Sequence, residues 1–158
     1  WENCILSART KRNLEKNNLL DIHAANQFAN KVVKAFKVKV TNVNCPARSL
    51  SGGNLQKFIV GREILQNPKI LVVMQPTWGV DVSAAVEIHF ALHELAKKGA
   101  AVLVISQDLD ELITISDNFA VMSEGRLSRP MPTANMTAEQ IGLLIGTSPP
   151  KSMSGMSR

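Results

Sequence analysis

The sequence predicts an α/β fold with a mostly parallel sheet, and two observations carry that prediction. Residues 70–73 and 101–105 are apolar at every position, which is typical of parallel strands covered on both faces. A stretch with helical periodicity follows each segment, and strands that alternate with helices indicate an α/β layer fold. With 158 residues, the chain is long enough to build one domain around a core.

Composition indicates an ordinary globular protein with free thiols. No apolar run approaches the ~18 residues that a membrane span needs. The sequence opens on Trp1, without methionine or a secretory leader, so we expect a fragment or a trimmed chain. Cys4 and Cys45 lie far apart and lack the spacing of metal ligands, which favours free cysteines in a reducing compartment.

The net charge of +5 raises the question of a nucleic-acid partner. The lysines of one segment supply much of it: Lys31, Lys34, Lys37 and Lys39. This segment lacks the interleaved aromatic residues and the motifs of nucleic-acid binders. Such charge runs usually cover a solvated helix face, so no nucleic-acid partner is expected.

In the first third of the chain, an irregular start is expected to lead into one helix. Residues 1–20 are polar and show no clear periodicity. Asp21 can cap a helix that runs to about Phe36. The buried stripe of that helix is expected to consist of Ala25, Phe28, Val32 and Phe36. Residues 38–46 then form a short connection.

Two adjacent glycines precede the second helix. The first backbone N–H groups of a helix have no partner within it, and glycines allow a large anion to approach them. Ser51 adds a hydroxyl donor beside Gly52 and Gly53, and Asn54 adds a short polar side chain. The stretch indicates a phosphate-facing loop, although a serine-glycine turn before an ordinary helix fits the same residues.

The second helix is expected to bury one face and to end at a proline. Asn67-Pro68 stops it, because proline cannot continue a helix. Its apolar residues fall near one side at 3.6 residues per turn: Leu55, Phe58, Ile59 and Leu65.

The two later helices have clear start and stop signals. Asp81 or Ser83 starts one of them, and Gly99 lies just past its end. Its inner face is expected to hold Ile88, Leu92 and Leu95. Asp108 opens the other, with a stripe of Leu109, Leu112 and Ile113.

The last part of the chain contains a turn and a capping pair. Glu124-Gly125 indicates a hairpin-like turn. Thr137 with Gln140 resembles a capping box that starts a helix to Ile145.

The order and spacing of four motifs resemble the nucleotide-binding domain of ABC transporters. Residues 50–54 match the signature loop of that family, and residues 70–75 match its Walker B strand. Residues 79–81 match its D-loop, and residues 106–108 match its switch region, or H-loop. The resemblance implies an incomplete P-loop NTPase-like core with a mostly parallel sheet and a helical subdomain.

The resemblance also implies three parts of the chain. Residues 1–66 would form the helical subdomain, which ends in the signature loop and its helix. Residues 67–147 would form the C-terminal half of the ATPase core. Residues 148–158 are small, polar and proline-containing, and are expected to be a disordered tail.

One motif that the chemistry needs is missing from the sequence. No run of the form G-x-x-x-x-G-K-[ST] is present to cradle the β- and γ-phosphates. In the ABC family this P-loop precedes the region that this chain resembles. The core sheet should then lack neighbours, so an apolar strand face or edge is expected to be uncovered. We expect dimerisation, swapping or a missing segment to hide it.

Three family positions that serve catalysis carry altered residues. Met74 stands where the Walker B Asp helps to hold Mg²⁺, and a thioether offers magnesium no hard oxygen ligand. Gln75 stands at the catalytic Glu position, where it can orient water but not accept its proton. Gln107 replaces the switch His. The resemblance therefore implies that this half does not hydrolyse ATP alone.

The signature loop, in contrast, is nearly intact. In the family it closes on the γ-phosphate held by a partner's P-loop, and Ser51, Gly52 and Gly53 match that role. Asn54 stands where the family more often has Gln. Asp81 matches the D-loop Asp that communicates between two sites. ATP and Mg²⁺ are thus expected mainly at a composite site.

The motifs look most like those of importers for simple sugars or nucleosides. This implies an ATP-binding subunit on the cytoplasmic side of the membrane, coupled to permease subunits and a second nucleotide-binding domain. A homodimer of this chain is one alternative partner. A non-transport ABC ATPase and a nucleotide-free scaffold module also remain open. His89 and His93 are four residues apart, but no third metal ligand is evident, and no metal site is expected.

Overall fold

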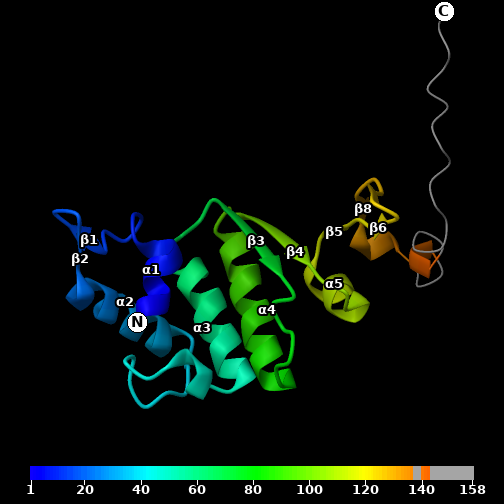
Figure 1. The fold of residues 1–158 in the computed structure, drawn as a ribbon. Coiled ribbons are helices and arrows are strands. Elements are labelled where there is room, and N and C mark those ends of the chain that lie inside the picture. Colours follow the sequence, from blue (N-terminus) through cyan, green and yellow to red (C-terminus); the bar gives the residue numbers. More distant parts are fainter. Residues whose placement is uncertain (137–139, 143–158) are drawn as a thin grey trace, which may run out of the picture. The chain divides into compact units, whose positions relative to one another are not determined.

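The computed structural model describes residues 1–136 and 140–142 (Figure 1). Thr137, most of the helix expected to run to Ile145, and the tail expected at 148–158 lie outside the described residues. The chain divides into two compact units, residues 1–107 and 108–158, which are described separately below. The boundary expected between residues 66 and 67 would separate a helical subdomain from the ATPase core, and it stays a prediction.

The first twenty residues are regular, so the irregular start expected from their polarity was wrong. Helix α1 spans Glu2–Ala8, and strands β1 (Glu15–Lys16) and β2 (Leu19–Leu20) form an antiparallel hairpin. Asn17 and Asn18 connect the strands with φ of 54° and 61°. Asparagine tolerates this left-handed region better than most residues, so the Asn pair was the turn signal in the sequence.

Helix α2 spans Ile22–Ala35 and begins as expected at Asp21, whose carboxylate accepts a hydrogen bond from the Ala24 amide at 2.9 Å. Such a cap satisfies one of the unpaired amides of the first turn. The helix packs in a first core cluster together with residues of α1. This cluster contains Cys4, Ala8, Leu14, Ala25, Phe28, Ala29, Val32, Val38 and Phe58. Phe36, expected in the stripe, is half-buried against it.

Helix α3 spans Gly52–Ile64 after a short 3₁₀ turn, η1, at Ala47–Ser49. It is buried on two sides, because Phe58 lies in the first core cluster and Val60 lies in the next one. Ile59, expected on the buried face, is 37% exposed. One continuous stripe was the wrong expectation for a helix with neighbours on both sides. The Phe36 ring lies so close to Gly61 that an added Cβ would stand 2.5 Å from it.

Strands β3 (Ile70–Met74) and β4 (Ala101–Ile105) form a parallel pair, with Ile70 opposite Ala101 and Met74 opposite Ile105. Helix α4 (Val82–Lys97) connects them and covers one face of the pair (Figure 1). The second core cluster lies between them and contains Val60, Leu71, Ile88, Leu92 and Leu95. The inner face predicted for α4 is therefore confirmed, and Gly99 follows with φ of 91°.

Among the described residues of the first unit, none covers the other face of the β3–β4 pair. The side chains on this face are large and apolar, and between 47% and 74% exposed: Ile70, Val72, Met74, Leu103 and Ile105. Strands buried on both faces were therefore the wrong expectation. The uncovered apolar face, in contrast, was predicted from the missing P-loop half and is present. We call these five residues the bare sheet face.

The second unit is built from short elements. Helix α5 (Leu109–Ile115) begins at its Asp108 cap, and η2 is a 3₁₀ turn at Thr133–Asn135. Antiparallel pairs join β5 (Asn118–Phe119) to β8 (Met131–Pro132), and β6 (Met122–Ser123) to β7 (Arg126–Leu127). Its core cluster contains Phe119, Val121 and Ile141, with Leu109 and Leu112 packed against it. Ile113, expected in the stripe, is 39% exposed.

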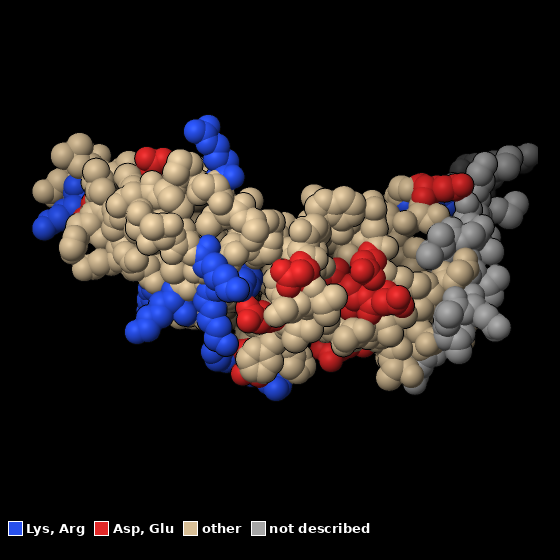
Figure 2. Space-filling model, turned by 90° about the horizontal axis from the view of Figure 1, so that it is seen from below, with Lys and Arg blue, Asp and Glu red and all other residues tan. Residues whose placement is uncertain are grey.

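The surface has two further properties that bear on partners. Within the described part of the chain, no helix is both long and apolar enough to cross a membrane. Figure 2 shows the Lys and Arg side chains of one face in separate groups with uncharged surface between them.

Candidate phosphate-facing site

The signature loop and the D-loop segment meet at one corner of the first unit. Gly52 and Gly53 open α3, and a Cβ on Gly52 would stand 2.8 Å from the Gly79 carbonyl oxygen. A Cβ on Gly53 would stand 3.2 Å from Ala84 Cβ and 3.4 Å from an Asp81 carboxylate oxygen. This close approach by itself accounts for the glycine at position 52. Segments about thirty residues apart in the sequence thus form one site.

Ser51 is the N-terminal flanking residue of α3, and its exposed side chain does not cap the helix. Instead, its Oγ accepts a hydrogen bond from Asn54 Nδ2 at 2.8 Å. Asn54 Oδ1 in turn accepts from the backbone N–H of Lys39 at 2.7 Å. Sequence reasoning missed this contact with Lys39, because a backbone donor carries no side-chain signal. The first-turn amides and the Ser51 hydroxyl thus stand together at an exposed helix N-terminus.

Asp81 is the N-cap of α4, where its Oδ1 accepts from the Ala84 amide at 2.9 Å. The side chain is exposed, and its other oxygen lies near Gly53. The same capping geometry recurs at Asp21 and Asp108. A structural role therefore explains Asp81 locally, and its position beside the signature loop is what distinguishes it from the other two caps.

The altered catalytic positions lie at the carboxyl ends of β3 and β4. Met74 ends β3 and is 74% exposed. Gln75 follows with φ of 51°, in the left-handed region that is costly for most residues. Its backbone N–H donates to the Ile105 carbonyl at 2.8 Å. The Ser106 hydroxyl and Gln75 Oε1 are 3.5 Å apart, a weak contact. Gln107 is exposed beyond β4.

The two sets of residues differ in what they can hold. Oriented amides and a hydroxyl at the N-terminus of α3 fit a phosphate oxygen. The strand ends do not fit Mg²⁺, because Met74 presents a thioether where a hard oxygen is needed. Among the described residues, no group of three or more His, Cys, Asp or Glu side chains is placed to hold a metal ion.

The buried ammonium group of Lys57 links α3 to its neighbours. Lys57 is 9% exposed, and its Nζ donates to Glu87 of α4 at 3.0 Å and to the Lys37 carbonyl at 3.3 Å. It therefore ties α3 both to α4 and to the segment that carries Lys39. Sequence reasoning missed Lys57, since a lysine in a helix is normally read as solvent-exposed.

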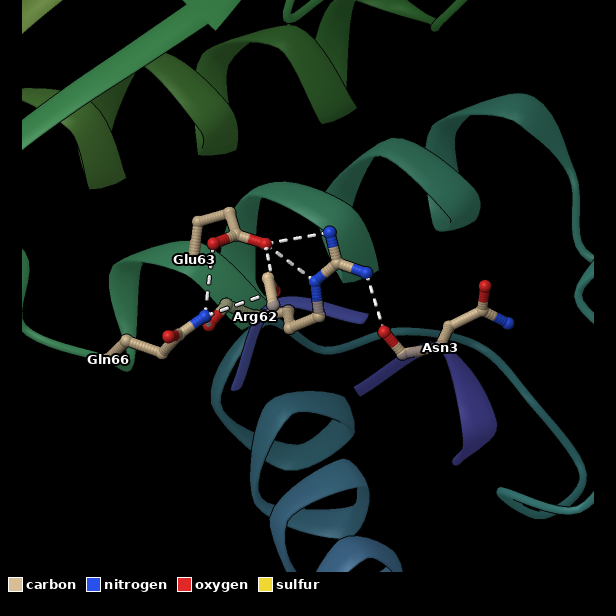
Figure 3. A network of polar contacts seen from close by, with 5 residues as sticks. Asn3, Arg62, Glu63 and Gln66 are labelled. Carbon is tan, nitrogen blue, oxygen red and sulfur yellow. Dashed lines mark hydrogen bonds and ion pairs between the residues drawn. The ribbon is translucent and has the colours of Figure 1, made fainter. Parts of the chain in front are cut away.

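The other end of α3 is held by a polar network with α1 (Figure 3). Figure 3 shows the Arg62 guanidinium between the Asn3 carbonyl, at 2.6 Å, and the Glu63 carboxylate, at 2.7 Å. Gln66 Nε2 donates to the other Glu63 oxygen at 3.0 Å. These contacts fix the orientation of α3 and hence of the loop at its start.

Cysteine and histidine side chains are the other reactive groups among the described residues. Cys4 and Cys45 are free, and burial raises the pKa of the Cys4 thiol to about 11. A thiol that stays protonated is a poor nucleophile. His23 Nε2 lies 2.8 Å from Gln27 Nε2, one turn further along α2.

Sequence comparisons relate the chain to import ATP-binding proteins. No family model matches it. It is 39% identical over 144 residues to the nucleoside import ATP-binding protein NupA of Lactococcus lactis subsp. cremoris (strain MG1363). The aligned region covers 91% of this chain and 28% of that protein. It is also 38% identical over 131 residues to the ribose import ATP-binding protein RbsA 2 of Streptomyces coelicolor (strain ATCC BAA-471 / A3(2) / M145). This second alignment covers 83% of this chain and 24% of that protein. The chain thus spans only about a quarter of the length of these relatives.

The fold has a solved counterpart. It is similar to a dimeric ATP-binding cassette in a post-hydrolysis state bound to ADP and Pi, with a TM-score of 0.65 and 19% identity. The similarity covers 82% of this chain and 56% of that cassette. The sequence matches and the shared fold show that this chain belongs to the ABC family, with the fold of its nucleotide-binding domain.

Proposed function

We propose that this chain supplies the signature loop to an ATP site whose P-loop belongs to a partner domain. The observation that carries the proposal is the contact of Gly52 and Gly53 with Gly79 and Asp81. It builds an exposed helix N-terminus next to a D-loop segment. The similarity to a nucleoside import protein and to a ribose import protein supports an importer of nucleosides or of a simple sugar as the parent assembly.

The proposed contribution to chemistry is electrostatic. The first amides of α3 and the Ser51 hydroxyl would donate hydrogen bonds to the γ-phosphate of ATP held by the partner. Charge that develops on the phosphoryl oxygens is stabilised by donors already in place. Removal of one such donor typically lowers kcat on the order of 10²–10³-fold. ATP with Mg²⁺ would thus bind at a composite site, with the metal on the partner's side.

This chain would not hydrolyse ATP with its own strand ends. Gln75 cannot accept a proton, and a lost general base typically costs on the order of 10²–10⁴ in rate. Met74 offers no magnesium ligand, and Gln107 carries no charge. The role proposed for this half is therefore to complete a site and to transmit its state to the permease.

The proposed partners follow from the same assignment. A large exposed apolar patch marks an interaction site, so we expect a partner to bind the bare sheet face. That partner would be half of a second nucleotide-binding domain or a second copy of this chain. Permease subunits would bind the helical subdomain, which places the protein peripherally on the cytoplasmic side of the membrane. The transported substrate would be selected by those subunits.

The first test measures Mg-ATP binding by the chain alone. Trp78 is 70% exposed beside Gly79, so its fluorescence reports on the D-loop corner once Trp1→Phe removes the second tryptophan. We expect no binding up to millimolar Mg-ATP. Saturable binding or turnover by the chain alone would contradict the proposal, because a phosphate site would then exist on this chain itself.

The second test adds a P-loop-bearing ABC nucleotide-binding domain whose own signature serine is changed to alanine. Turnover in the mixture then depends on the signature loop of this chain. We expect ATPase activity with the wild-type chain and a loss of about 10²-fold with Ser51→Ala. Ser83→Ala, a serine on α4, is the matched control and should change nothing. Equal activity with and without the chain would favour a nucleotide-free scaffold.

A further inference from the structure

The inference concerns the direction in which the Ser51 hydroxyl donates, and it rests on the proposed function. Asn54 is the only side chain that the structure records as bonded to Ser51 Oγ within the described residues, at 2.8 Å. The same side chain accepts from the Lys39 amide at 2.7 Å. Ser51 is exposed and Asn54 is half-buried, so the serine is the more accessible of the two residues.

The orientation of the Asn54 amide follows from its partners. A backbone N–H can only donate, so the atom that faces Lys39 must be the carbonyl oxygen Oδ1. The NH₂ group must then face Ser51, and it can only donate. Ser51 Oγ is therefore the acceptor in this contact. The hydroxyl hydrogen is left to point away from Asn54.

We propose that Asn54 is a positioning residue, which turns the Ser51 hydroxyl outward as a donor to the partner's γ-phosphate. A free serine hydroxyl rotates and can offer either its hydrogen or a lone pair. When Asn54 already occupies a lone pair of Oγ, the rotation of the hydroxyl is restricted before an anion binds. Less conformational entropy is then lost on binding. Lys57 strengthens this arrangement, because its bond to the Lys37 carbonyl holds the segment that carries the Lys39 amide.

Asn54→Asp tests the proposal with an almost isosteric change. It keeps an acceptor for the Lys39 amide but replaces the donor that faces Ser51 with an acceptor. The Ser51 hydroxyl should then donate inward to the new carboxylate. Asn26→Ala is the matched control, because Asn26 on α2 also donates its side-chain amide, to the Ile22 carbonyl, but lies in another element.

The first measurement is nuclear magnetic resonance of the ¹⁵N-labelled full chain, which needs no nucleotide. In wild type, one proton of the Asn54 side-chain amide should show a downfield shift from its bond to Ser51. Ser51→Ala should remove that shift while the Lys39 amide stays protected from exchange. An Asn54 side-chain signal that Ser51→Ala leaves unchanged would overturn the proposal, whatever the outcome for ATP.

The second measurement is the ATPase assay of the mixture described above. We expect Asn54→Asp to lower kcat about tenfold or more at unchanged KM for ATP. In the Ser51→Ala background, Asn54→Asp should cost little, and this non-additivity separates hydroxyl orientation from the added negative charge. Activity of Asn54→Asp equal to that of Asn26→Ala would overturn the proposal. Full activity of Ser51→Ala would instead overturn the proposed function, and the resonance measurement would still decide the role of Asn54.

Discussion

The two corners that carry the family motifs are built very differently. At the signature corner, Asn54 makes two hydrogen bonds of 2.7 Å and 2.8 Å, and Gly52 contacts the D-loop backbone closely. At the strand-end corner, Met74 is exposed and the contact between Gln75 and Ser106 is 3.5 Å long. The Asn54 side chain is thus held by two short hydrogen bonds, whereas the Gln75 side chain makes a long contact and Gln75 is held mainly through its backbone N–H, 2.8 Å from the Ile105 carbonyl.

This difference indicates which function each corner can support. A site that stabilises a transition state needs groups already held in place, and the signature corner has them. At the strand ends, Met74 offers Mg²⁺ no hard oxygen ligand and the Gln75 amide cannot accept a proton from water. The division of labour proposed above, with this chain completing a partner's site, would account for both observations.

The largest effect is expected from Gly52→Ala. Its Cβ would stand 2.8 Å from the Gly79 carbonyl oxygen, so the backbone must shift. We expect a loss of about 1–3 kcal/mol in the free energy of unfolding, measured by urea denaturation, and loss of turnover in the mixture. Gly53→Ala is the graded comparison, because its nearest contact is 3.2 Å. An equal or larger cost for Gly53→Ala would show that the corner is less tightly packed than its geometry indicates.

Asp81→Ala compared with Asp21→Ala separates capping from communication. Each carboxylate accepts from the amide three residues on, at 2.9 Å, so each substitution should cost about 1 kcal/mol in unfolding free energy. Only Asp81 lies beside the signature loop. We therefore expect Asp81→Ala alone to lower ATPase activity of the mixture. Equal activity losses in the two variants would reduce Asp81 to a helix cap.

Gln75→Gly tests the strain at the strand-end corner. Gln75 has φ of 51°, which glycine adopts without steric cost. We expect unfolding free energy to rise by about 0.5–1 kcal/mol, since relief of the left-handed backbone cost outweighs both the weak side-chain contact that is lost and the entropy that glycine gains in the unfolded chain. Thermal unfolding followed by circular dichroism measures the change. A destabilised variant would mean that the Gln75 side chain is better anchored than its 3.5 Å contact implies.

The smallest effect is expected from restoring the family residues, Met74→Asp together with Gln75→Glu. These side chains return a magnesium ligand and a base, but the sequence contains no P-loop to hold the phosphates. Mg-ATP binding and turnover by the chain alone should therefore stay at background. Measurable turnover by this variant alone would contradict the division of labour between the two corners.

Local signals made much of the fold predictable. The sequence correctly predicted the helix cap at Asp21, the helix end before Gly99 and the strand at 101–105. Caps, helix ends and apolar runs are predictable because each depends on only a few neighbouring residues. Ile59 was misplaced, since α3 has neighbours on two sides and its periodicity cannot show that. The strand residues of the bare sheet face were misread because an apolar run does not say which face is covered.

The candidate site was predictable only in part. The motif order indicated Ser51 to Asn54 and Asp81 as site residues, and those roles stay predictions. The contact between Asn54 and Lys39 depends on how the segment after α2 approaches α3, a tertiary feature without a sequence signature. The buried Lys57 and its bond to Glu87 likewise require the packed helices to be seen.

The β3–β4 pair has a consequence for the behaviour of the chain in a cell. A two-stranded sheet leaves one backbone edge open on each strand, and here an apolar surface with exposed Val72 and Leu103 adjoins both edges. Open edges beside apolar surface are templates for irregular association of nascent chains. Yield of soluble protein should therefore depend on synthesis rate and temperature, and co-expression of a covering partner should raise it more than any change at the signature corner.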